Sequence, residues 1–291
     1  MSIRWRPLSW RTALTDLPAV PEVKADITIF QMISRRLHWA LGAAVLLLSA
    51  CSIEDMESPE HKISIIVSQE TGTRTTMTEG EEFASFEWEE ADMASFHVFE
   101  NGRTASSVRA SLNAGLATVE ATFRNGSAPY TYTAYMSGNV EASMPAVPAV
   151  QEPVAGRYDP KADILVARPV TSLTVPEGFQ FEMRRVIAVN KMTLRGLVPG
   201  ERVLKVALDA DKCLTGSYDM SADAFVQGGK SLTVSTSVKV AADGTAVIYF
   251  ISVPVEDAAV TVHVATDKSV YSKTLARTIS FPGNMVSRFG V

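Results

Sequence analysis

The sequence predicts an all-β protein that contains two β-sandwiches. Six short segments alternate apolar and polar residues and are enriched in β-branched and aromatic side chains, which is the pattern of half-buried strands. These segments are residues 62–67, 117–123, 130–135, 202–208, 232–236 and 259–264. Glycine-containing turn signals separate the segments, and no part of the chain shows a long apolar period of 3.6 residues. Many short strands at this spacing favour sandwiches.

A proline-rich stretch predicts the boundary between the two sandwiches. Residues 144–176 contain six prolines around one short apolar strand at 164–167. We therefore expect an N-terminal sandwich at 62–168 and a C-terminal sandwich at 169–291. The chain has 291 residues, enough for two ordinary domains. Residues 246–253 are nearly all apolar, which favours a central strand that is covered on both faces.

Composition and charge exclude several classes of protein. The chain is 46% hydrophobic and 20% charged, which fits a packed globular protein, and its net charge of −5 argues against nucleic-acid binding. Two cysteines cannot form a disulfide framework or a four-ligand zinc site. One hydrophobic run lies near the N-terminus, and no later stretch is long enough to span a bilayer.

The hydrophobic run near the N-terminus has the features of an export signal. It covers residues 37–50, which is shorter than the roughly 20 residues of a transmembrane helix, and two arginines at 35 and 36 precede it. The run ends in Leu48, Ser49, Ala50 and Cys51, which resemble a bacterial lipobox. In a lipobox the cysteine thiol receives lipid and the cysteine becomes the new N-terminus. We expect Cys51 to be that residue; the alternative is an ordinary buried cysteine.

The residues on either side of this signal suggest how the N-terminal region is divided. Residues 1–31 carry three prolines and three acidic residues ahead of the basic pair, so they do not fit a signal peptide. We expect a misassigned extension at 1–31 and a lipoprotein signal peptide at 32–50 that starts at Met32. Residues 51–61 would form a lipidated acidic tether. Its acids at 54, 55 and 57 resemble the surface-export signal of Bacteroidetes lipoproteins, although they also suit a plain solvated tether.

Several segments, taken in order, resemble the fimbrillin family of lipoproteins, the subunits of Bacteroidetes (type V) pili. The match covers essentially all of residues 62–291, with Ala91 standing where the family usually has glycine. The segments that carry it are 73–75, 86–99, 130–135, 148–151, 158–167, 185–194 and 279–291. The resemblance implies two tandem transthyretin-like Greek-key β-sandwich domains and assembly by strand exchange between subunits.

The resemblance also suggests which residues take part in assembly. In the family, a stalk subunit is cleaved after an arginine, and its first strand then leaves a groove for a strand from a neighbour. Arg74 is the candidate processing site, unless it is an ordinary loop arginine of an uncleaved anchor or tip subunit. The candidate donor strand lies at the C-terminal end of the chain. Its apolar residues are Ile279, Phe281, Val286, Phe289 and Val291.

The residues after Cys51 contain no catalytic constellation. His61 is expected to be solvated in the tether, and His263 to face solvent on the side of its strand opposite the valines. The third histidine after Cys51 is His97, and no two of the three have metal-ligand spacing. Cys213 is expected to be buried. A dense acidic run at 79–92 suits a solvated loop better than a calcium site. We therefore expect that the protein is not an enzyme and that it binds neither a metal ion nor a cofactor.

These observations lead to two functional hypotheses. The first is a structural or adhesive subunit of a cell-surface fimbria, anchored in the outer membrane through Cys51. Its partners would be other subunits, membrane lipid and, for an adhesin, a host or bacterial surface ligand, with no nucleic acid. The second is a surface glycan-binding lipoprotein for nutrient uptake. Sugar sites usually stack rings on exposed aromatic residues, and Trp88 is the only tryptophan after Cys51, although tyrosines could form a platform.

Overall fold

The computed structural model describes residues 60–69, 76–79, 84–88, 90–114, 116–124, 126–141, 143–154, 156–226 and 228–291. The described residues form β-strands and two short 3-10 helices, η1 (Glu90–Ser95) and η2 (Pro160–Ala162), which confirms the all-β prediction. Among these residues, no helix has the length and apolar character needed to cross a membrane. Residues 57–291 form one compact unit.

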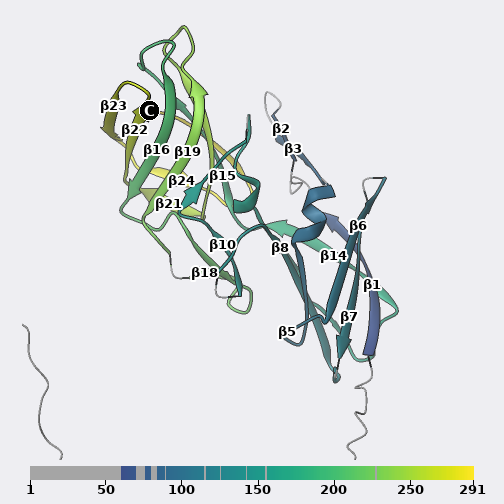
Figure 1. The fold of residues 1–291 in the computed structure, drawn as a ribbon. Coiled ribbons are helices and arrows are strands. Elements are labelled where there is room, and N and C mark those ends of the chain that lie inside the picture. The colour runs from purple at the N-terminus through teal and green to yellow at the C-terminus, as the bar shows by residue number, and fades with distance from the viewer. Residues whose placement is uncertain are drawn as a thin grey trace, which may run out of the picture. The chain divides into compact units, whose positions relative to one another are not determined.

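Nine strands between residues 60 and 185 form one sheet with the order β5-β4-β8-β12-β14-β1-β7-β6, in which β13 also pairs with β8. Figure 1 shows β1, β7 and β6 side by side. The strands are β1 (Glu60–Gln69), β4 (Phe96–Glu100), β5 (Arg103–Thr104), β6 (Ser107–Asn113), β7 (Leu116–Arg124), β8 (Tyr130–Ser137), β12 (Ile164–Ala167), β13 (Val170–Ser172) and β14 (Gly178–Arg185).

Strand β1 occupies the interior of this sheet. It pairs antiparallel with β7 and parallel with β14, so that Ile65 lies opposite both Val119 and Phe179. Ile63, Ile65 and Val67 are buried, whereas the side chains between them are exposed. The alternation predicted for residues 62–67 is therefore confirmed. Burial of each such side chain contributes roughly 1.5–3 kcal/mol.

The strands after residue 185, together with three short strands at 140–151, form smaller sheets. A four-stranded sheet has the order β18-β17-β10-β9, a five-stranded sheet the order β11-β19-β16-β22-β23, and a three-stranded sheet the order β20-β15-β25. Their strands are β9 (Val140–Glu141), β10 (Met144–Val147), β11 (Val150–Gln151), β15 (Ala188–Leu194), β16 (Arg202–Ala210), β17 (Gly216–Asp219), β18 (Ala224–Val226), β19 (Ser231–Lys239), β20 (Ala246–Ser252), β22 (Val260–Thr266), β23 (Val270–Thr274) and β25 (Val286–Gly290). Two separate pairs are β2 (Thr76–Glu79) with β3 (Ala84–Glu87), and β21 (Val255–Ala258) with β24 (Ile279–Phe281).

One apolar core joins the five-stranded and three-stranded sheets. Val206 and Leu208 of β16, Val234 of β19, and Ile248 and Phe250 of β20 are all buried in it. Inner faces of two sheets that share a core are the arrangement of a β-sandwich. The Greek-key connections within the sandwiches stay a prediction.

Two details of the sequence analysis are wrong in the structure. The large sheet does not end at the expected boundary at 168/169, because β13 and β14 pair with β8, β12 and β1. Pro169, between β12 and β13, and Pro176, between β13 and β14, lie at connections within the large sheet, whereas Pro145 lies in β10 of a smaller sheet. The apolar strand β20 lies at the edge of its sheet and not at its centre. It is nevertheless largely buried, because Phe250 packs into one core and Ile251 into another.

Candidate functional site

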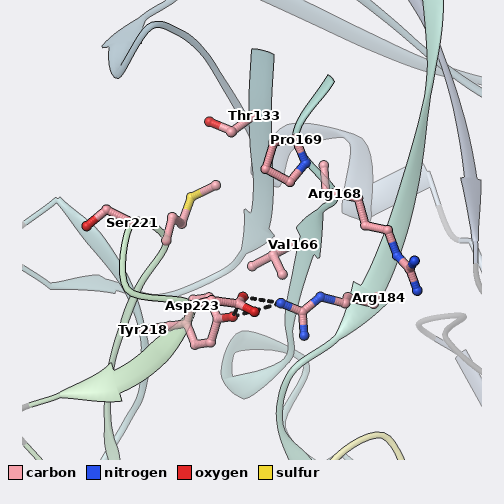
Figure 2. Close-up of a pocket in the computed structure, with 10 residues that line it drawn as sticks. Thr133, Val166, Arg168, Pro169, Arg184, Tyr218, Ser221 and Asp223 are labelled. Carbon is pink, nitrogen blue, oxygen red and sulfur yellow. Dashed lines mark hydrogen bonds and ion pairs between the residues drawn. The ribbon is translucent and has the colours of Figure 1, made fainter. Parts of the chain in front are cut away.

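A cavity of about 520 Å³ lies where three strands of the large sheet meet the turn between β17 and β18. We call it the Arg184 cavity. Figure 2 shows Val166 and Arg184 on one wall, with Tyr218, Ser221 and Asp223 on the other. Its lining residues are Thr133, Val166, Ala167, Arg168, Pro169, Arg184, Tyr218, Met220, Ser221 and Asp223.

Three polar side chains bond to one another in the Arg184 cavity (Figure 2). Nη2 of Arg184 donates to Oδ1 of Asp223, and also to the hydroxyl of Tyr218 at 3.1 Å. The Tyr218 hydroxyl in turn donates to the same Oδ1. Burial of Tyr218, together with its hydrogen bond to Asp223, raises the pKa of the phenol to about 12. Tyr218 is therefore a neutral hydrogen-bond donor at physiological pH.

The β17–β18 turn holds Asp223 in place. Asp219, at the end of β17, accepts hydrogen bonds at Oδ1 from the backbone nitrogen of Ser221 at 2.8 Å and from its hydroxyl at 2.6 Å. These bonds lower the pKa of Asp219. A short polar side chain that bonds to the backbone two residues later is a common way to build a turn. Asp223 closes the turn in the left-handed region, with φ of 52°.

A buried ion pair lies at the end of β14, next to the Arg184 cavity. Nε and Nη2 of Arg185 each donate to a different carboxylate oxygen of Asp163 at 2.8 Å, and the two side chains are 1% and 3% exposed. Burial disfavours the charge on Arg185, but Asp163 more than compensates and raises the pKa of the guanidinium. Burial, then the charge of Asp163, raises the pKa of Tyr158, whose hydroxyl donates to Asp163 at 3.1 Å. Because all three side chains are buried, we assign this cluster a structural role.

The structure leaves several predicted site residues untested. Cys51, the lipobox residues Leu48, Ser49 and Ala50, Met32 and Arg74 all lie outside the described residues. Lipidation, the start at Met32 and processing at Arg74 therefore stay predictions. The same holds for the extension at 1–31, the signal peptide at 32–50 and most of the tether at 51–61.

The candidate donor residues belong to the core of their own chain in this structure. Phe281 of β24 is fully buried, with its ring centroid 6.0 Å from that of Phe250 and 5.7 Å from that of Phe289. Ile279, Phe289 and Val291 are partly buried against the same core, and Val286 against the neighbouring one. Strand β25 runs parallel to β15. Donation to another subunit would require this segment to leave its own sheet.

The environments expected for the histidines and for Cys213 are only partly confirmed by the structure. His61 is not solvated in a tether: it lies in β1, and its Nε2 is 2.6 Å from Oε2 of the buried Glu100. Cys213 is exposed instead of buried, because it follows β16 in a surface loop. His263 does face away from the core, with its side chain 43% exposed and Nε2 3.4 Å from Asp209. His97 stacks on Tyr135 with ring centroids 4.6 Å apart, and burial lowers its pKa.

In the part of the chain that the structure describes, no three His, Cys, Asp or Glu side chains are grouped so that they could hold a metal ion. The acidic run at 79–92 falls partly outside the described residues.

The Arg184 cavity itself was missed by the sequence analysis. Arg184 and Asp223 are 39 residues apart, and no local pattern connects them.

Comparison with known proteins finds a similar fold in a solved bacterial protein. No protein-family model matches the sequence, and no curated protein matches it either. A candidate cell adhesion protein from Bacteroides ovatus is 13% identical with a TM-score of 0.51, over 80% of this chain and 92% of that one. This likeness shows a shared fold, which agrees with the fimbrillin-like fold expected from the sequence.

Two further solved structures are similar at lower scores. A candidate cell adhesion protein from Bacteroides uniformis is 12% identical with a TM-score of 0.47, over 79% of this chain and 91% of that one. The fimbrial anchor protein Mfa2 from Porphyromonas gingivalis is 15% identical with a TM-score of 0.41, over 79% of this chain and 89% of that one.

Proposed function

We propose that the chain is a structural or adhesive subunit of a cell-surface fimbria, exported as an outer-membrane lipoprotein and assembled by exchange of β-strands. The observation that carries this proposal is the place of β1. This strand forms eight residue pairs with β7 and six with β14, in the interior of the large sheet. It is also the first described strand after Cys51, and it ends at Gln69, five residues before Arg74.

Removal of β1 would create an acceptor groove. Cleavage after Arg74 would separate β1, together with the lipid anchor, from the rest of the chain. Departure of the strand would expose the pockets of Ile63, Ile65 and Val67 and leave backbone groups of β7 and β14 without partners. An extended segment with the same alternation would satisfy both needs, because it supplies apolar side chains and backbone hydrogen bonds together.

The C-terminal segment remains the proposed donor, with β25 as its main part. Within the described residues, β25 pairs with β15 alone and lies at the edge of its sheet, so it can leave without separating another strand pair. Phe289 is partly buried there, whereas Phe281 is fully buried in β24. Donation of β25 alone would therefore expose less buried apolar surface in the chain's own core than donation of the whole segment from 279 to 291.

The glycan-uptake hypothesis has less support. Trp88, the only tryptophan after Cys51, is half-buried, with its ring centroid 5.8 Å from that of Phe96. It therefore contributes to the core of the large sheet and not to an exposed stacking platform.

Two measurements on cells separate these hypotheses. Immunogold electron microscopy with antibodies to the chain should label surface filaments, and mild solubilisation should give a ladder of this chain with other subunits. Deletion of the gene should remove or shorten the filaments. A deletion strain with normal filaments and impaired growth on a polysaccharide would overturn the proposal and favour glycan uptake.

A further inference from the structure

We propose that the Arg184 cavity binds a neutral carbohydrate. The inference deepens the adhesive role proposed above, because it names the class of ligand that an adhesive subunit would hold. The binding chemistry itself does not depend on fimbrial assembly. The volume of the Arg184 cavity, about 520 Å³, lies within the usual range of small-molecule sites, about 300–1,000 Å³.

The charges around the cavity favour an uncharged ligand. Arg184 is paired with Asp223, and Arg168 is paired with Glu182 at 3.3 Å. The positive charges of the lining are therefore balanced. An anionic ligand drawn to Arg184 would lie beside the carboxylate of Asp223, whose side chain is 65% exposed, and a cationic ligand drawn to Asp223 would lie beside Arg184. Each would meet a like charge, whereas a ligand that carries only hydroxyl groups meets neither penalty.

The polar groups have capacity left for hydroxyl groups. Within the described chain, the hydrogen bonds of Arg184 use Nη2, and those of Asp223 use Oδ1. A guanidinium has five N–H donors in a fixed fork, and a carboxylate has two acceptor oxygens. The remaining nitrogens of Arg184 and the second oxygen of Asp223 thus place donors beside an acceptor. Neighbouring hydroxyls on a sugar ring, each both donor and acceptor, match such a pair.

The rest of the lining suits the apolar face of a sugar ring. Val166, Pro169 and Met220 supply carbon surface, and Thr133 and Ser221 add hydroxyls at the rim. Tyr218 does not offer its ring face to a ligand, because the ring is buried and packs in a T-shaped contact against Phe225 with centroids 5.1 Å apart. A site without a stacked aromatic ring should be weaker than one with it, so we expect one or two sugar units to bind with modest affinity.

The test is a glycan array probed with the purified full-length chain. The array should include neutral, sialylated, sulfated and amine-bearing glycans, and neutral hits should be titrated in solution by calorimetry. Arg184→Gln and Asp223→Asn should each weaken binding at least tenfold. Thr133→Trp should also abolish binding, because it fills the cavity from β8 without touching the ion pair. Arg109→Gln changes an exposed arginine on β6 and is the matched control, with wild-type affinity expected.

Thermal melts show whether each variant is folded, and Thr133→Trp keeps the test valid if an ion-pair variant unfolds. Binding limited to sialylated, sulfated or amine-bearing glycans would overturn the proposal. So would the absence of any hit, or unchanged affinity in a folded Thr133→Trp variant. These outcomes concern the cavity alone, whereas loss of filaments and of the subunit ladder on cells concerns the proposed fimbrial function.

Discussion

The side-chain amide of Gln151 pairs with the backbone of Ile251, a residue 100 positions later in the chain. Nε2 of Gln151 donates to the Ile251 carbonyl at 2.7 Å, and the Ile251 nitrogen donates to Oε1 at 2.9 Å. Gln151 is fully buried. The side chain therefore takes the place of a neighbouring strand and satisfies two backbone groups of β20. Because β11 itself pairs with β19, Gln151 ties the five-stranded sheet to the three-stranded sheet.

Replacement of Gln151 by leucine should lower the free energy of unfolding by about 2–4 kcal/mol. The buried N–H and C=O groups of Ile251 would both lose their partner, and each unsatisfied group costs about 1–3 kcal/mol. Urea denaturation followed by circular dichroism measures the change. Gln180→Leu, at an exposed position of β14, is the control and should change stability by less than about 0.5 kcal/mol. Equal effects of the two variants would contradict the assigned role of Gln151.

The buried pair of Asp163 and Arg185 should be far more sensitive than a surface pair. Asp163→Asn removes the main counter-charge of the buried Arg185 guanidinium, together with the carboxylate that accepts its two hydrogen bonds, which should cost about 3–5 kcal/mol. Glu182→Gln breaks the exposed pair with Arg168 and should cost less than about 1 kcal/mol. Chemical denaturation of both variants makes the comparison. A small loss in Asp163→Asn would show that another group compensates the charge.

Tyr218 should stay protonated in the folded protein above pH 10. Its pKa is raised to about 12 from an ordinary value of 10.0, mainly by burial and then by the bond to Asp223. A raised pKa in the folded state stabilises the protein below pH 10, and that contribution is lost as the pH rises toward 12. Melting temperatures measured from pH 9 to 12 should therefore fall less steeply in Tyr218→Phe than in the wild type. Parallel curves would show that Tyr218 ionises normally.

Cys51 should carry the lipid. Cys51→Ala should abolish incorporation of radiolabelled palmitate and release the protein from the membrane fraction, because the thiol is the lipid acceptor. Cys213→Ala is the matched control, since Cys213 is the other cysteine of the chain, and it should label like the wild type. Continued labelling and membrane fractionation of Cys51→Ala would show that the lipobox prediction is wrong.

Arg74 should be an early trypsin site. Its neighbours Gly72, Thr73, Thr75 and Thr76 are small or polar, which favours an accessible loop. Limited trypsin treatment followed by mass spectrometry should show cleavage there first, and the cut protein should form oligomers at high concentration as β1 is replaced. Arg74→Gln should remain intact at this position and monomeric. Resistance of Arg74 while other arginines are cut, or a cut protein that keeps β1 and stays monomeric, would exclude polymerisation through this site.

Sequence reasoning identified the strands correctly where burial alternates along the chain. Segments 62–67, 117–123, 130–135, 202–208, 232–236 and 259–264 lie mainly within strands β1, β7, β8, β16, β19 and β22. Period-two alternation is a local property, because successive side chains of a strand point to opposite faces. The side of His263 followed from the same rule.

Two of the wrong expectations depend on contacts between distant segments of the chain. His61 was expected in a solvated tether, but β4 brings Glu100 to it from 39 residues away. The boundary at 168/169 was inferred from prolines, whereas the sheet continues because β14 pairs with β1, more than 100 residues earlier in the chain. Local composition contains no information about which strand will become a neighbour.

The sequence by itself therefore determined the all-β class, most strand positions and the alternation that buries Ile63, Ile65 and Val67. Only the tertiary structure decided that β1 lies between β7 and β14, that the Gln151 side chain bonds to the backbone of β20, and that Arg184 pairs with Asp223 beside a cavity. The physical reason is that burial along a strand depends on the order of neighbouring residues. Strand pairing and the meeting of charges depend instead on which of many distant segments gives the lowest free energy for the whole chain.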